Sequence, residues 1–361
     1  MDLYNEGISG ILTEQGNGWF YKENLGDGHF TVAKPVIPKP SFLGIASGVL
    51  QLQDLEADGR KQVVINSSGL NGYFELKEDA GSEGSGNWEN FRTFEQIPNV
   101  NLRDPNTRLL DLNGDGQPEI VITEENVFTW YPSAGTLGYD APELAPKPFG
   151  EEQGPAIVFA DSTQSIFLAD MSGDGLTDIV RIRNGQVCYW PNLGYGRFGA
   201  KVNMDKAPWF DHPDQFNPAY LQLADISGTG ATDIIYLGKN QFLAWLNLSG
   251  NAWSQACDIS PFPDTAQPNA VTVTDLLGNG TSCIVWSSPL PANAGEPLRY
   301  IDLMNGQKPH ILKSYRNNFG KKVEWTYKSS THYYLEDKKP VNPDHQVALP
   351  GAGGEPGDRD R

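Results

Sequence analysis

The sequence has few of the residues and patterns that mark several common classes of protein. Cysteine occurs only three times in 361 residues, and Cys188, Cys257 and Cys283 are too scattered for a disulfide framework or a zinc-type CxxC pair. No apolar run approaches the ~20 residues that a membrane-spanning helix needs, and no basic and apolar segments near the N-terminus form an export signal. Long amphipathic helical stretches are hard to find. We therefore interpret the cysteines as small core or strand residues and expect no membrane span and no signal peptide.

Positive charge is also scarce. Lys and Arg number 27 against 45 Asp and Glu, which gives a formal net charge of −18. Because phosphate binding needs clustered Lys and Arg, the composition argues against nucleic acid or an anionic membrane as a partner. One segment, residues 308–328, is locally basic, and we interpret it as a solvated strand edge or a contact with the acidic remainder of the chain. Its cations are Lys308, Lys313, Arg316, Lys321, Lys322 and Lys328.

Catalytic motifs are missing as well. The five histidines form no HExxH motif, and the sequence contains no GxSxG nucleophile elbow and no P-loop. His212, between Asp211 and Asp214, is the nearest approach to a catalytic constellation, but a loop histidine between acids is far more often simply solvated. The sequence therefore predicts a protein that is not an enzyme.

Glycine (39 residues) and proline (26 residues) are abundant, and an acidic turn is repeated six times at intervals of roughly 50 to 60 residues. The clearest copy is DMSGDGLTD, from Asp170 to Asp178, followed by Ile179 and Val180. Each copy keeps the first Asp, a glycine at the sixth position and an aliphatic pair at the tenth and eleventh. The glycine supplies a positive φ, the Asp accepts free backbone N–H groups, and the pair begins a buried strand. The copies begin at Asp2, Asp54, Asp111, Asp170, Asp225 and Asp275.

A second regularity follows the turn in four of the six copies. An apolar or aromatic residue stands 17 positions after the first Asp, another aromatic 19 or 20 positions after it, and a second turn starts 22 positions after it. Together with a strand before each Asp and a strand after the second turn, this gives four short strands per repeat of about 55 residues, as in one blade of a propeller. The sequence therefore predicts an all-β, six-bladed β-propeller. The second turns start at Asn24, Ser133, Asn192 and Asn247.

The repeats also suggest boundaries. We place the propeller at residues 1–316, an exit segment at 317–338 and a disordered, Pro- and Gly-containing tail at 339–361. A Gly/Ser/Glu insertion at 78–86 is predicted to be a mobile surface loop. Because no strand precedes Asp2, the first blade is expected to lack its innermost strand. Either residues 322–327 fill that gap or the chain is a piece of a longer protein, and we favour the second alternative.

The turns are also candidates for metal binding. They resemble the calcium loop D-x-[DN]-x-[DN]-G-x-x-[DE], in which hard oxygen ligands at alternate positions converge on one ion. The third and fourth copies supply oxygens of the required kind at all four positions, whereas the second copy ends in Gln62 and the fifth has only hydroxyls between its two acids. The alternative, which we favour, is that the Asp side chains cap backbone amides without metal, so that no cofactor is required. The candidate calcium ligands are Asp111, Asn113, Asp115 and Glu119 in the third copy and Asp170, Ser172, Asp174 and Asp178 in the fourth.

The Asp-x-x-Gly-x-Gly turns are similar to the FG-GAP/VCBS repeats of integrin-α-type propellers. Several segments outside the turns resemble the middle region of the B component of insecticidal toxin complex (Tc) toxins, the TcaC/TcdB-like proteins, and the resemblance spans roughly residues 2–338. These segments are residues 9–15, 21–28, 285–291, 298–304, 308–310, 317–320 and 333–338.

The resemblance implies a function for the chain. In that family, a six-bladed propeller docks the toxin-carrying B–C cocoon onto the pentameric A component and acts as a gate, with an SpvB-like domain before it and Rhs-type shell sequence after it. It thus implies a non-enzymatic, extracellular part of a toxin complex, with the A and C components as partners. This chain starts inside the first blade and has no Rhs continuation, so it looks truncated. The alternative function is a free-standing adhesion or glycan-binding propeller, which could depend on calcium.

Overall fold

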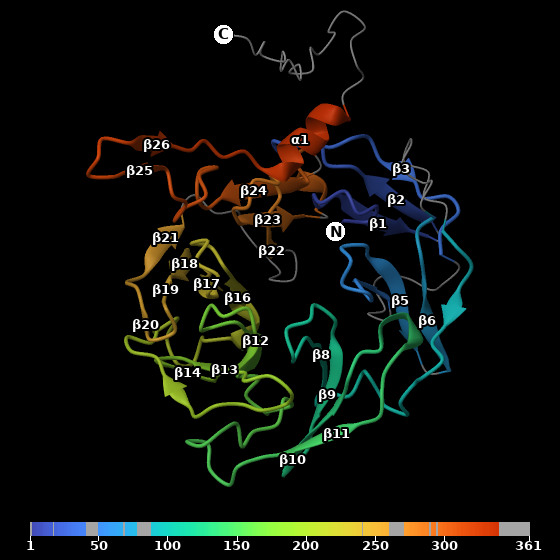
Figure 1. Ribbon diagram of the computed structural model, residues 1–361, viewed down its shortest axis with the longest axis vertical. Helices are drawn as coiled ribbons and strands as arrows, with labels where there is room; N and C mark the ends of the chain where they lie inside the picture. Colours follow the sequence, from blue (N-terminus) through green and yellow to red (C-terminus); the bar gives the residue numbers. More distant parts are fainter. Residues whose placement is uncertain are drawn as a thin grey trace, which may run out of the picture.

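The computed structural model is a ring of six β-sheets around a common axis, with one short α-helix (Figure 1). It describes residues 2–16, 18–40, 50–67, 69–77, 88–239, 241–259, 271–288, 290–293 and 295–338. The predicted all-β, six-bladed propeller is confirmed. The predicted loop at 78–86 and the predicted tail at 339–361 lie outside the described residues.

Each blade is an antiparallel meander in which strands that follow one another in the sequence pair side by side. The first three blades are β1 (Ile11–Gln15), β2 (Gly18–Lys22) and β3 (Lys34–Pro35); β4 (Leu50–Gln53), β5 (Gln62–Ser67), β6 (Leu70–Phe74) and β7 (Arg92–Thr93); and β8 (Thr107–Leu110), β9 (Glu119–Thr123), β10 (Val127–Tyr131) and β11 (Glu143–Pro146). The last three are β12 (Ile166–Ala169), β13 (Asp178–Arg183), β14 (Gln186–Trp190) and β15 (Val202–Asn203); β16 (Leu221–Ala224), β17 (Asp233–Leu237), β18 (Phe242–Trp245) and β21 (Cys257–Ile259); and β22 (Val271–Thr274), β23 (Cys283–Ser287) and β24 (Leu298–Asp302).

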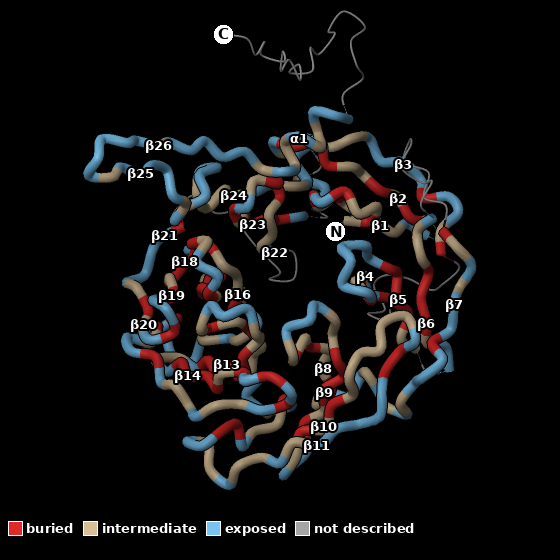
Figure 2. Tube along the Cα trace, viewed as in Figure 1, coloured by how far each residue is buried: buried red, intermediate tan, exposed pale blue. Residues whose placement is uncertain are grey.

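Shorter elements decorate the ring. The hairpin β19 (Asn247–Leu248) and β20 (Ala252–Trp253) belongs to the fifth repeat, and β25 (Ser314–Arg316) pairs with β26 (Lys322–Glu324) in an exposed hairpin outside the ring (Figure 2). The helix α1 (Ser330–Asp337) follows this hairpin. Single 3-10 turns cover Gly135–Leu137, Pro218–Tyr220 and Pro291–Asn293. Among the described residues, no helix is long and apolar enough to cross a membrane.

The aliphatic pairs explain why the blades stack. In β13, Ile179 packs in a cluster with residues of the third blade, while Val180 packs in a cluster with residues of the fifth. Ile234 and Ile235 of β17 likewise face the fourth and sixth blades. Successive strand residues point to opposite faces, so an apolar pair is what a strand between two neighbouring blades requires.

The first blade differs from the others. Its aliphatic pair, Ile11 and Leu12, is only half-buried, whereas the corresponding pairs of the other five repeats are buried. The blade contains three described strands, and β1, which carries the pair, stands at its edge. The alternative in which residues 322–327 supply the missing strand is wrong, because Lys322–Glu324 pairs with Ser314–Arg316 instead.

Candidate functional site

The first Asp of each acidic turn accepts backbone amides with both carboxylate oxygens. In the fourth turn, Asp170 Oδ1 accepts from Gly173 N at 2.7 Å and Oδ2 accepts from Gly175 N at 2.8 Å. Gly175 has φ +90°, a conformation that residues with a Cβ rarely adopt. The predicted turn chemistry is therefore confirmed. Asp111 and Asp275 likewise accept the amides three and five positions on, whereas Asp2, Asp54 and Asp225 accept the amides four and five positions on.

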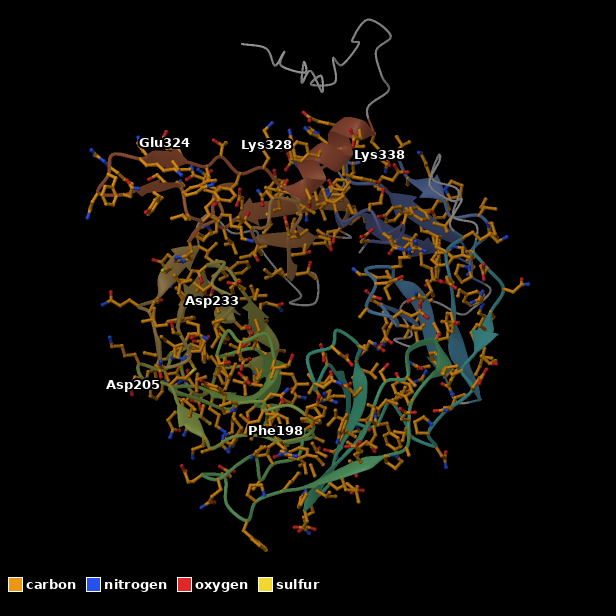
Figure 3. The ribbon with its side chains drawn as sticks, in the orientation of Figure 1. Phe198, Asp205, Asp233, Glu324, Lys328 and Lys338 are labelled. Carbon is orange, nitrogen blue, oxygen red and sulfur yellow. The ribbon has the colours of Figure 1, made fainter. Side chains whose placement is uncertain are left out.

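The ninth residue of the turn is a second, fully buried anchor. Asp233 Oδ2 accepts from Ile226 N at 2.9 Å and Ser227 N at 3.0 Å, and its Oδ1 accepts from Asn247 N at 2.7 Å. Its side chain is completely inaccessible to solvent and lies at the start of β17 (Figure 3). One carboxylate thus ties together the acidic turn, a central strand and the second turn of the blade.

Three other repeats use the same position to accept the amide of the residue after the first Asp. Glu119 Oε2 accepts from Leu112 N at 2.7 Å, and Asp178 Oδ2 accepts from Met171 N at 2.9 Å. In the second blade, Gln62 Oε1 takes this role and accepts from Leu55 N at 3.0 Å. A neutral amide can therefore replace the carboxylate at this position of the repeat.

The asparagine that opens the second turn links neighbouring blades. Asn192 Nδ2 donates to Leu112 O of the third blade at 3.1 Å, and Asn247 Nδ2 donates to Met171 O of the fourth blade at 2.9 Å. The acceptor is in each case the residue after the first Asp of the preceding turn. The sequence showed these asparagines as turn residues, but the 22-residue spacing alone does not reveal that they bind the preceding blade.

The same bond closes the ring between its two ends. Asn24 Nδ2 donates to Leu276 O of the sixth blade at 2.8 Å, across 252 positions of the sequence. The first and sixth blades thus meet as any two successive blades do. We call this junction of the first and sixth blades, together with α1, the ring seam.

Helix α1 lies across the ring seam. Thr331 Oγ1 donates to Gly278 O of the sixth turn, and Leu335 lies close to Gly26 of the first blade. At the end of the helix, Lys338 Nζ lies 2.7 Å from the buried Glu6 Oε1 (Figure 3). Burial lowers the pKa of Lys338, but its hydrogen bonds to Glu6 and Tyr334 and the charge of Glu6 together outweigh burial, so the net shift is upward. The helix therefore fastens the two ends of the ring together.

The buried acids of the turns have displaced pKa values. The pKa of Glu119 is raised to about 7 and that of Asp178 to about 6, mainly by burial and to a lesser extent by the other carboxylates of each turn. Hydrogen bonds from backbone amides act in the opposite direction but do not cancel the shift. Burial also raises the pKa of Asp233.

We expect Glu119→Gln to reduce the pH dependence of folding stability. The pKa of Glu119 is about 7 in the folded state against an ordinary value of 4.5, so between these values the folded state binds more protons than the unfolded chain. Stability therefore falls as the pH rises through this window, by about 2–3 kcal/mol from this group. The Glu119→Gln variant should lose this contribution to the change of stability with pH. Urea unfolding at about pH 5 and about pH 8 measures the effect, and an unchanged difference between the two pH values would contradict it.

The predicted calcium ligands are brought together within each turn but are occupied by hydrogen bonds. Asp111 accepts two backbone amides, and Asn113 Nδ2 donates to Asp115 Oδ2 at 3.1 Å and to Glu119 Oε1 at 3.0 Å. In the fourth turn, Ser172, Asp174 and Asp178 stand at the corresponding positions around Asp170. Within the described ranges, no group of three or more His, Cys, Asp or Glu side chains is arranged to hold a metal ion.

The remaining candidates for chemistry lie apart from one another. His212 is exposed, and its Nδ1 lies 3.6 Å from Asp214 Oδ2, in a solvent-facing loop. Cys188 and Cys283 are buried in β14 and β23, and Cys257 is exposed in β21. All three are free thiols. These positions agree with the interpretation of the cysteines as strand residues.

Two protein-family models match parts of the sequence. Residues 111–181 match an FG-GAP-like repeat, and residues 261–353 match the insecticide toxin TcdB middle/N-terminal region. No curated protein sequence gave a significant match.

Solved structures resemble the chain over most of its length. A structure of the Photorhabdus luminescens Tc holotoxin pore matches with 27% identity and a TM-score of 0.75, over 94% of this chain and 15% of that chain. A crystal structure of TcdB2-TccC3 without its hypervariable C-terminal region matches with 25% identity and a TM-score of 0.55, over the same shares of both chains. This chain thus spans about 15% of the length of those toxin chains.

A lectin shares the fold. The structure of an Agrocybe aegerita lectin that recognises non-reducing terminal N-acetylglucosamine matches with 20% identity and a TM-score of 0.51, over 78% of this chain and 71% of that chain. The higher identity and TM-score of the holotoxin match, and the TcdB segment found in the sequence, distinguish the toxin relatives from this one. In sequence and in fold, the chain resembles the FG-GAP-type propeller region of the B component of insecticidal Tc toxins, the TcaC/TcdB-like proteins.

Proposed function

We propose that this propeller is a non-enzymatic interaction module of a secreted toxin complex, which docks the B–C cocoon onto the A component and gates it. The observation that carries the proposal is the match to the Tc holotoxin pore over 94% of the chain, joined to the TcdB-type segment at 261–353. The ring supports it because blades fixed by buried carboxylates and inter-blade bonds form a stiff body whose loops provide a broad surface.

A repeated set of exposed leucines suggests the docking face. Leu25, Leu193 and Leu248 each follow the inter-blade asparagine of their repeat, and they are 50%, 63% and 47% exposed. Equivalent positions in a ring of repeats lie on the same face. Apolar side chains that recur at one solvent-exposed position suit a protein contact better than they suit water. We assign these leucines, which we call the second-turn leucines, to the contact with the A component.

The test uses this propeller within a full-length Tc B component. We expect it to bind the Tc A component in a biolayer interferometry assay, and we expect Leu193→Arg with Leu248→Arg to weaken binding at least about tenfold, the loss of roughly 1.4 kcal/mol or more. Leu312→Arg is the matched control, because Leu312 is 59% exposed but precedes the β25–β26 hairpin outside the ring. Absence of association by the unaltered protein would refute docking, and unaltered affinity of the double variant would refute the assigned face.

A glycan-binding propeller is the second candidate, favoured by a cavity between the third and fourth blades. The cavity has a volume of about 560 Å³, and its lining includes Trp130, Glu143, Tyr195 and Arg197. Tyr195 is 68% exposed, so its ring is available for stacking on a sugar. Binding to a glycan array that Tyr195→Ala abolishes would favour this function over docking.

Calcium binding at the third and fourth turns is a separate proposal, carried forward from the sequence pattern. Its physical support is the mutual repulsion of three carboxylates, Asp111, Asp115 and Glu119, which a bound cation would relieve. Saturating calcium should then raise the thermal midpoint, by the equivalent of about 2.7 kcal/mol at 100 times the dissociation constant. A midpoint that is the same in calcium and in EDTA would refute the proposal and leave amide capping as the role of these side chains.

A further inference from the structure

A cavity of about 840 Å³ lies at the ring seam, where the sixth acidic turn, the start and end of the β25–β26 hairpin and the first turn of α1 meet. Three lysines from different segments line it. Lys308 follows β24 and Lys313 precedes β25. Lys328 follows β26, just before α1 (Figure 3). His332, on the first turn of α1, lines the same space. The fold therefore gathers positive groups at one place in a chain whose net charge is −18.

These lysines have no acidic partner of their own. Asp275 is the acidic residue in the lining, and its two carboxylate oxygens already accept the amides of Gly278 at 2.8 Å and Gly280 at 2.7 Å. Among the described residues, no carboxylate forms an ion pair with Lys308, Lys313 or Lys328. By contrast, Lys322 and Lys338, which are outside the lining, pair with Glu324 and Glu6.

The contacts of two of the lysines fix where their charges lie. Gly280 has no side chain, and Lys308 Nζ lies 3.3 Å from the position where a Cβ of this residue would be. The charge of Lys308 therefore lies against the backbone of the sixth turn. Lys328 Nζ lies 3.2 Å from His332 Nε2, and that ring nitrogen in turn lies 3.2 Å from Glu336 Oε1. Glu336 thus lies beside the histidine, and Asp275 caps the turn that Lys308 lies against, but neither carboxylate forms an ion pair with a lysine of the lining.

Neutral donors complete the lining. Ser329, Ser330 and Thr331, at the start of α1, line the cavity. Ser329 accepts the N-capping bond from His332 N, and Thr331 donates to Gly278 O, whereas the Ser330 hydroxyl has no hydrogen-bond partner among the residues that the structure describes. Ammonium groups and hydroxyls are donors that suit an oxyanion, and the positive end of α1 adds to them.

We propose that this seam cavity binds a small organic molecule that carries a phosphate or sulfate ester, with Lys308, Lys313 and Lys328 around the oxyanion and the Ser330 hydroxyl as a donor. Three lysines that form no ion pair with a described carboxylate match a multiply charged ester better than a single carboxylate. The volume lies in the range of sites for small organic ligands and exceeds what an inorganic ion fills. The ligand joins the sixth turn to α1, so its binding stabilises the ring seam. The proposal is independent of docking to the A component.

Isothermal titration calorimetry with inorganic pyrophosphate, in low salt, tests the site on the whole chain. We expect a saturable heat in the unaltered protein, and about tenfold weaker binding in Lys308→Gln and in Lys328→Gln, because each removes one charge-assisted contact worth about 1.5 kcal/mol. Arg316→Gln and Lys321→Gln are matched controls, since both remove a cation of the hairpin that does not line the cavity. Circular dichroism melts verify that the variants are folded.

Two further ligands distinguish the sources of the oxyanion. Glucose 6-phosphate and glucose 6-sulfate have the same sugar, so tighter binding of one identifies a phosphate or a sulfate ester as the chemistry that the site prefers. Absence of saturable heat with all three probes would overturn the proposal. Equal weakening in the Arg316 and Lys321 variants would also overturn it, because binding would then reflect diffuse positive charge rather than a built cavity.

Discussion

Asp233→Ala is expected to lower the free energy of unfolding by about 3–5 kcal/mol. The substitution leaves three buried amides without an acceptor, at a cost of about 1–3 kcal/mol each, and removal of a buried charge offsets part of that cost. The amides belong to Ile226, Ser227 and Asn247, and the Asp233 side chain that accepts them is completely buried. Few single side chains in the ring hold so many backbone groups in place. Urea unfolding at neutral pH, followed by circular dichroism and tryptophan fluorescence, measures the loss.

Two substitutions in the same blade serve as controls. Asp225→Ala removes the exposed cap of the same turn, where Thr229 N and Gly230 N can turn to water, so we expect a loss of only about 1 kcal/mol. Asp233→Asn retains one acceptor oxygen and should fall between the two. Equal losses from Asp225→Ala and Asp233→Ala would show that burial of the ninth-position carboxylate does not matter.

Much of the fold could be predicted because the repeat shows both of its physical requirements within a short window. The glycine at the sixth position, such as Gly175, and the aliphatic pair, such as Ile179 and Val180, lie within eleven residues of the first Asp. Positive φ and burial on both faces are local demands, and they are met in every complete blade. The ring then follows from stacking one repeat on the next.

The helix α1 could not be predicted in this way. Its sequence, Ser330 to Asp337, has Thr, His and two Tyr in its first five residues, which are weak helix formers. The helix is stable where it is because Ser329 caps it and because Thr331 and Leu335 lie against glycines of the sixth and first blades. These contacts join positions that are about 50 and about 300 residues apart, and a pattern of a few residues carries no information about them.

The candidate sites show the same limit. Asp111 and Asp170 were recognised as carboxylates in a turn, but whether their oxygens meet amides or an ion depends on backbone geometry that the pattern does not contain. The positive cluster at 308–328 was visible in the sequence, yet only the fold separates Lys308, Lys313 and Lys328, which share a cavity, from Lys321 and Lys322, which lie outside it. Composition indicated the charge, and tertiary structure determined its arrangement.

Combining Asn24→Ala with Lys338→Ala is expected to open the ring seam while the other blades stay stacked. Asn24 Nδ2 donates to Leu276 O at 2.8 Å and Ser9 O at 2.9 Å, and Lys338 is the ion-pair partner of the buried Glu6. The first and sixth blades are not consecutive in sequence, so non-covalent contacts, including these polar ones and the packing of Phe30 against the sixth blade, hold them together. Each substitution should cost about 2 kcal/mol, because it strands buried carbonyls or a buried carboxylate.

Hydrogen exchange followed by mass spectrometry locates the opening. A combined loss of about 4 kcal/mol should accelerate exchange in β1 and in β22 to β24 by about 1,000-fold, if exchange there proceeds through opening of the seam. Asn192→Ala removes the equivalent bond between the third and fourth blades, whose chain connection is intact, and should leave exchange in β1 and β22 unchanged. Acceleration spread evenly over all six blades would mean that the ring unfolds as one unit and that the seam is not its weak point. Acceleration confined to the first and sixth blades would identify the junction spanned by α1 as the place where the ring opens. A ligand that joins the sixth turn to α1 would then hold the ring closed at that junction.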